Sequence, residues 1–66
     1  MFNLVRAEAV LGGKPLGKEY MRTYIWSGDD AIAECVAEVF KLCKDEFDVH
    51  GPDFSISVTF PVDPTP

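Results

Sequence analysis

The chain has 66 residues, of which 47% are hydrophobic and 26% charged, and its eleven acidic and six basic residues give a net charge of −5. This composition is typical of one small folded domain and argues against a disordered tail or a membrane protein. A chain of this length typically buries only about 60% of its unfolded surface, so a large enclosed active site is not expected. The acidic balance disfavours direct binding to nucleic acid or to an anionic membrane, and it favours a basic partner.

The first part of the chain predicts a β-hairpin. Apolar side chains alternate with others loosely over residues 2–11 and strongly over residues 18–26, which is typical of strands. Residues 12–17 have the sequence GGKPLG. Glycine and proline favour chain reversal, so this segment is the expected hairpin loop.

The second part predicts a helix and a third strand. Apolar residues recur at spacings of three and four over residues 29–47, after a Ser-Gly-Asp-Asp segment whose side chains can cap a helix. A turn over residues 48–53 leads to residues 54–60, where apolar and hydroxyl side chains alternate as in a half-buried strand. Residues 61–66 contain three prolines and predict an extended tail.

Together these elements predict a single α+β domain over residues 1–66 with the plan ββαβ. A hairpin followed by a right-handed helical crossover places strand 54–60 parallel to strand 18–26, on the far side of strand 2–11. The expected sheet is therefore three-stranded and mixed or antiparallel, with strand 2–11 in the centre and helix 29–47 on one face.

The two cysteines, Cys35 and Cys43, both fall within the predicted helix. Eight helical residues span about 12 Å, whereas a disulfide needs Cα atoms roughly 4.4 to 6.8 Å apart, so no bridge joins them. We expect both thiols to be free and to fill the core. Free thiols, together with an N-terminus that lacks an export signal, predict a reducing cytoplasm.

Two features resemble catalytic motifs. Residues 12–18 have the glycine and lysine spacing of a phosphate-binding loop, but Glu19 follows instead of serine or threonine, and a strand follows instead of a helix. His50, the single histidine, lies between Asp48 and Asp53 in a predicted turn, where a solvated turn residue is the simpler interpretation. We therefore predict no catalytic, cofactor-binding or metal site, and an enzyme or nucleotide binder using these residues is the least favoured alternative.

The acidity is local. Residues 1–28 carry four basic and two acidic residues, a net charge of +2, whereas residues 29–66 carry nine acidic and two basic residues, a net charge of −7. Asp30, Glu34 and Glu38 follow one another at i, i+4 and i+8, about 6 Å apart along a helix. Such a row is either a solvated face that keeps a small protein soluble or a phosphate-mimicking surface that binds a basic partner. The candidate partner-binding residues are Asp29, Asp30, Glu34, Glu38, Asp45, Glu46 and Asp48.

A second candidate surface is the sheet face away from the helix. If Met21 and Ile25 face the helix, the alternate side chains lie on this open face, which one helix cannot cover. Exposed aromatic residues usually mark protein contacts, so this surface predicts packing or self-association before a heteromeric or nucleic-acid contact. The residues concerned are Tyr20, Arg22, Tyr24 and Trp26.

A short, acidic, single-domain chain with the row Asp30, Glu34 and Glu38 resembles the small phage-encoded anti-CRISPR proteins, and the acidic type I-C inhibitors in particular. The resemblance covers size, charge and plan over the whole chain and involves no sequence motif. It implies a non-enzymatic inhibitor in the bacterial cytoplasm, without a cofactor, that occupies a basic DNA-binding surface such as that of a CRISPR surveillance complex subunit. The alternative is a structural or self-associating module, and the expected state is a monomer or a weak homodimer.

Overall fold

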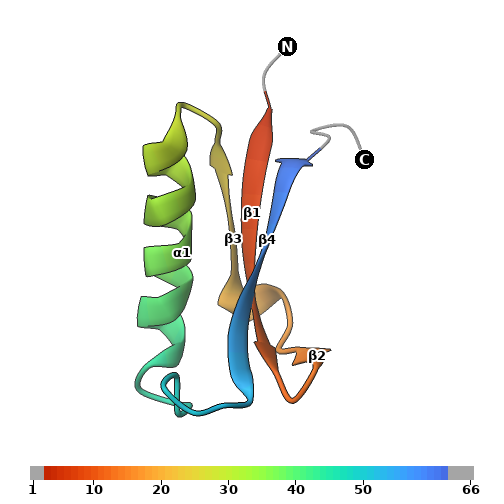
Figure 1. The fold of residues 1–66 in the computed structure, drawn as a ribbon, viewed down its shortest axis with the longest axis vertical. Coiled ribbons are helices and arrows are strands. Elements are labelled where there is room, and N and C mark those ends of the chain that lie inside the picture. The colour runs from red at the N-terminus through yellow and green to blue at the C-terminus, as the bar shows by residue number, and fades with distance from the viewer. Residues whose placement is uncertain (1–2, 63–66) are drawn as a thin grey trace.

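The central strand of the sheet is β1 (Leu4–Leu11) in the computed structural model, which describes residues 3–62. β3 (Met21–Ile25) pairs antiparallel with one edge of β1, and β4 (Phe54–Val62) pairs antiparallel with the other. The helix α1 (Asp29–Cys43) packs on one face of this sheet (Figure 1). The predicted α+β plan and strand order are therefore confirmed, with β4 parallel to β3 across the intervening β1.

The predicted hairpin loop contains a tight turn and a short strand. Gly12 and Gly13 have φ values of 61° and 81°, the left-handed conformation that a two-residue type I′ hairpin turn requires. β2 (Lys14–Pro15) then pairs with the end of β1, and a 3₁₀ turn, η1 (Lys18–Tyr20), leads into β3. The predicted strand 18–26 is consequently shorter, because its first three residues are helical.

α1 starts as predicted but ends earlier. Gly28 is the N-cap residue, and no side chain of the described residues forms a capping hydrogen bond at this end of the helix, so the predicted side-chain cap is wrong. Asp29 and Asp30 lie in the first turn, where their negative charges interact favourably with the helix dipole. Regular helix ends at Cys43, four residues before the predicted end. The backbone carbonyl of Cys43 accepts from the amides of both Glu46 and Phe47, which tightens the chain into a turn while Phe47 still packs against the core.

β4 extends two residues beyond its predicted end and includes Pro61. A proline is tolerated here because β4 is an edge strand, so one side of its backbone needs no ladder partner. Leu4 pairs with Val62 and Arg6 with Thr59, so β4 has one residue more than β1 between these two pairs, as in a β-bulge. The predicted strand residue 2 and tail residues 63–66 lie outside the described residues.

The core lies between β1 and α1. Every second residue on one face of β1 packs against residues of α1 that are four apart in sequence. The side chains of both sets are almost fully buried. The small side chains on β1 allow the helix to approach closely, and the two cysteines are free and buried, as predicted. The buried residues are Val5, Ala7, Ala9, Ala31, Cys35, Val39 and Cys43.

The orientation predicted for the second strand is wrong. Val5 pairs with Tyr24 and Ala7 pairs with Arg22, and residues directly opposite each other in a ladder point to the same face. Of the candidate residues Tyr20, Arg22, Tyr24 and Trp26, this pairing places Arg22 and Tyr24 on the helix side of the sheet, and all three aromatic side chains pack against the core instead of lying on the open face. Ile25 is on the open face instead and is 60% exposed.

Candidate functional site

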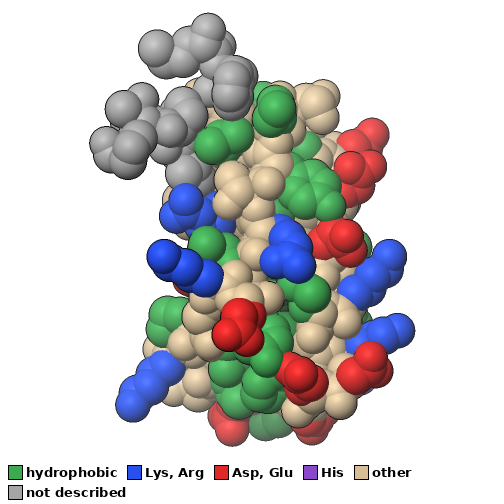
Figure 2. All heavy atoms as spheres, turned by 180° about the vertical axis from the view of Figure 1, so that it is seen from behind, with side chains coloured by type: hydrophobic (Ala, Val, Ile, Leu, Met, Phe, Trp, Pro, Cys, Tyr) green, Lys and Arg blue, Asp and Glu red, His purple; other side chains and the backbone are tan. Residues whose placement is uncertain are grey.

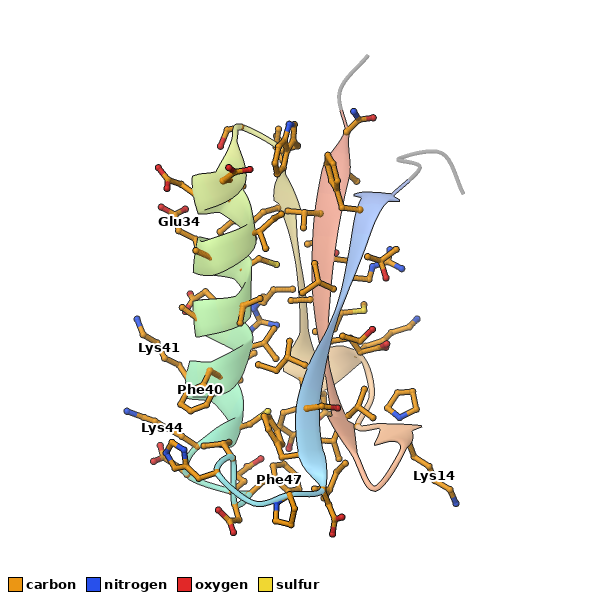
Figure 3. The ribbon with its side chains drawn as sticks, viewed as in Figure 1. Lys14, Glu34, Phe40, Lys41, Lys44 and Phe47 are labelled. Atoms are coloured by element: carbon orange, nitrogen blue, oxygen red, sulfur yellow. The ribbon has the colours of Figure 1, made fainter. Side chains whose placement is uncertain are left out.

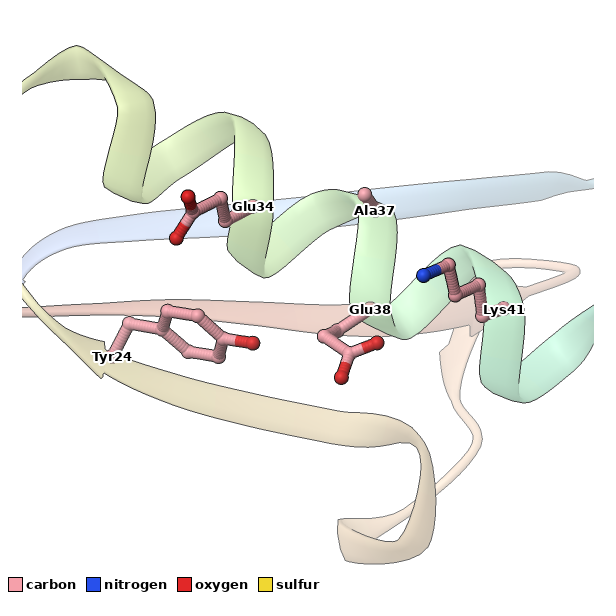
Figure 4. Close-up of a pocket in the computed structure, with 5 residues that line it drawn as sticks. All are labelled: Tyr24, Glu34, Ala37, Glu38 and Lys41. Carbon is pink, nitrogen blue, oxygen red and sulfur yellow. The ribbon is translucent and has the colours of Figure 1, made fainter.

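A shallow groove lies between α1 and β3. It has a volume of about 230 Å³ and is lined by Tyr24, Glu34, Ala37, Glu38 and Lys41. In Figure 4 the hydroxyl of Tyr24 points toward Glu38, the side chain of Glu34 extends away from Glu38, and Lys41 lies at the other end of the row. We call Asp30, Glu34 and Glu38 the acidic flank, because they succeed one another at intervals of four residues on α1.

The electrostatic environment of Tyr24 shows how close the carboxylates lie. Burial raises the pKa of Tyr24, and the negative charges of Glu38 and Glu34 raise it further. The nearby Arg22 opposes this effect. A tyrosine hydroxyl is protonated at neutral pH, so Tyr24 is a hydrogen-bond donor beside two carboxylates.

The seven predicted partner-binding residues do not form one cluster. Asp29 and Asp30 are exposed in the first turn of α1, whereas Asp45, Glu46 and Asp48 follow its C-terminal end. A helix of 15 residues is about 22 Å long, so these two groups are far apart. Only Glu34 and Glu38 line the groove.

Two of the candidate carboxylates have local structural contacts. Glu46 accepts a short hydrogen bond from the Tyr20 hydroxyl, and this bond, more than burial, raises the pKa of Tyr20 to about 12. The ring of Tyr20 also packs edge-on against Phe47, with centroids 5.4 Å apart. Asp48 Oδ1 accepts a 3.2 Å hydrogen bond from the backbone amide of His50. These contacts make Glu46 and Asp48 parts of the turn after α1.

The glycine loop and His50, which resemble catalytic motifs in the sequence, both have structural contacts in the fold. The glycine loop turns into β2 rather than into a helix, and the Gly12 amide donates to the Asp53 carbonyl at 3.0 Å. The His50 ring packs edge-on against Phe40, with centroids 5.7 Å apart. Over residues 3–62, the His, Cys, Asp and Glu side chains form no group of three that could hold a metal ion. Neither is any helix in that range long and apolar enough to cross a membrane.

The sequence does not predict three members of the groove, Tyr24, Ala37 and Lys41, or one hydrogen bond. Lys41 follows Glu38 by three residues, a spacing that places both on one side of a helix and signals their proximity. Alternation alone does not show which sheet face Tyr24 occupies, and no local pattern indicates the bond between Tyr20 and Glu46, which are 26 residues apart. Figure 2 shows the molecule from behind, with acidic side chains along the helix side and basic ones among them and over the sheet.

Comparison of the chain with protein-family models, with curated proteins and with solved structures finds no match.

Proposed function

We propose that the chain is a non-enzymatic acidic binding protein that competes with nucleic acid for a basic surface of a nucleic-acid-handling protein. The acidic flank is the observation that supports this proposal best. Asp30 and Glu34 are exposed and Glu38 is half-buried, all three on one regular helix. A rigid scaffold reduces the ordering cost of association, and complementary charge speeds the encounter, so inhibition needs no chemical step.

A CRISPR surveillance complex is the partner class that follows from the resemblance to anti-CRISPR proteins. Such complexes hold nucleic acid in positively charged channels, which an acidic helix can occupy. The contact would extend from Asp30 to Glu38, because Lys41 and Lys44 interrupt the negative charge beyond that point.

Charge reversal of the flank tests this function. We expect the double variant Glu34→Lys with Glu38→Lys to need at least about tenfold more protein, equivalent to about 1.4 kcal/mol, to displace labelled target DNA from a purified type I-C surveillance complex. Fluorescence anisotropy of the DNA measures the displacement, and the salt dependence of the competition should weaken in the same variant.

The matched control is Glu19→Lys with Asp53→Lys, which changes the net charge equally at exposed positions outside α1. Circular dichroism verifies that both double variants are folded, and the control should stay within about twofold of the wild type, since its charges lie away from the flank. An equal loss of DNA displacement in the two double variants would show that only the net charge matters and not the position of the acidic flank. A wild-type protein that never displaces DNA would contradict the proposal.

A further inference from the structure

Among residues 3–62, one edge of the sheet has no strand partner and is poorly protected. β4 is nine residues long and pairs with β1 along one side, whereas β3, at the opposite edge, has five residues and includes Arg22. Natural proteins protect exposed sheet edges with short strands and charged side chains. β3 fits that description, but residues 54–60 have the sequence FSISVTF, without any charge.

An apolar row accompanies this edge. Ile56 and Val58 pair with Ala9 and Ala7, so the row lies on the helix side of the sheet. α1 packs mainly over β1 and β3 and leaves Val58 41% and Phe60 39% exposed. Figure 1 shows β4 on the side of the sheet away from β3. Exposed apolar side chains beside free backbone donors and acceptors are the features of a strand that binds another strand.

We propose that β4 pairs antiparallel with β4 of a second copy of this chain, so that one continuous sheet extends across a two-fold symmetric dimer. This proposal is independent of the function proposed above, because it uses a different surface.

The residue pattern of β4 is complementary to itself. In an antiparallel pair of identical strands, odd-numbered residues oppose odd-numbered ones, so hydroxyl side chains meet hydroxyl side chains and apolar ones meet apolar ones. A two-fold axis at Ser57 uses the whole of residues 54–60 and places Ile56 opposite Val58 of the second copy. Pro61 lacks an amide hydrogen and limits the pairing to this segment.

Charge favours this edge over the acidic flank as the place where two copies can pair. Two chains of net charge −5 repel each other, and the acidic flank is the surface where that repulsion would be strongest. Figure 4 views the acidic flank from the side of β3, with β4 behind. Pairing through β4 therefore keeps the two acidic flanks apart and brings no charged side chain of residues 54–60 against another.

The test is the mass in solution, measured by light scattering and sedimentation over increasing protein concentration. We expect the wild type to reach twice 7.3 kDa. Ser57→Lys should weaken dimerisation at least about fivefold, because it places like charges opposite each other across the two-fold axis. Ser57 is exposed, so this substitution leaves the core of the protein unchanged. Val58→Lys, at a second exposed position of β4, should weaken the same dimer independently. The matched control Ile25→Lys adds the same charge at the opposite edge and should remain dimeric.

Hydrogen exchange provides a second measurement. Alternate amides of β4 should become more protected as the concentration rises, whereas amides of β3 should not. A wild type that stays at 7.3 kDa at every concentration would overturn the proposal, as would a Ser57→Lys variant that dimerises like the wild type. Protection of β4 that appears only when a different protein is added would also overturn it, in favour of strand pairing with that protein.

Discussion

At the scale of single residues, Tyr20 connects parts of the chain that are far apart in sequence. It ends η1, donates its hydroxyl to Glu46 beyond α1, and packs its ring against Phe47. Tyr20 therefore holds the turn after the helix against the start of β3. The same contact gives one carboxylate oxygen of Glu46, which is exposed, a structural role.

The stability of the fold should depend on Tyr20 at alkaline pH. The pKa of Tyr20 is raised to about 12 because its hydroxyl donates to the Glu46 carboxylate. The folded state therefore holds this proton more tightly than the unfolded state, whose tyrosine has the ordinary value of about 10. The contribution is complete below pH 10 and is lost as the pH rises through 12.

We expect the midpoint of urea unfolding, followed by circular dichroism, to fall with pH in that interval. The fall should be smaller in Tyr20→Phe, which lacks the titrating hydroxyl. An identical pH dependence in Tyr20→Phe and the wild type would contradict this account.

The two thiols should be unreactive in the folded protein. Burial raises the pKa of both Cys35 and Cys43, and the Cys35 thiol also donates to the Arg22 carbonyl at 3.2 Å. A thiol reagent can therefore react only after the folded chain opens. This opening costs a free energy of about 3 kcal/mol or more for a domain of this size. We expect labelling by a thiol reagent to be at least about a hundredfold slower than in urea. Rapid labelling of either cysteine under native conditions would be inconsistent with the core described here.

At the scale of elements, the packing of α1 on β1 supplies most of the core. Val39 is fully buried in that interface, whereas Val36 lies on the same helix but is half-buried. We expect Val39→Ala to lower the free energy of unfolding by about 2 kcal/mol, through lost burial and the cavity that remains. Val36→Ala should cost about half as much. Urea unfolding measures both, and equal costs would show that burial does not distinguish the two positions.

Which parts of the fold follow from the sequence depends on how local their cause is. The alternation of residues 54–60 and the spacing of apolar residues in α1 are local patterns, and both elements begin at the residue that these patterns predict, although α1 ends earlier and β4 ends later. The facing of β3 is not local, because alternation defines two faces without showing which one is inward. The condition that Met21 and Ile25 face the helix is not met, because the pairing register of β3 with Val5 and Ala7 decides the orientation.

The candidate site also has one part that follows from a local sequence pattern and one part that does not. The acidic flank follows from the helical period, which places Asp30, Glu34 and Glu38 together. The groove needs Tyr24 from another strand, so its composition depends on that same register. The early end of α1 depends on hydrogen bonds in the turn at Cys43, which no sequence pattern indicates.

At the scale of the whole molecule, the two proposed surfaces lie on different sides. The acidic flank borders β3, and the uncharged edge belongs to β4 (Figures 1 and 3). The two surfaces can therefore be tested separately. The double variant Glu34→Lys with Glu38→Lys should keep the dimeric mass, and Ser57→Lys should keep an intact acidic flank on each monomer. A dimer would also present two acidic flanks to a partner, which raises avidity where the geometry allows both to bind.

The central position of β1 has a consequence for the synthesis of the chain. β1 is synthesised before β4, with which it forms its longest pairing, and Leu4 lies opposite Val62. Contacts of this separation are slow to form, because a long loop must close before they are made. Until β4 has been made, one edge of β1 has no partner, so the sheet is completed only after residue 62 has been added.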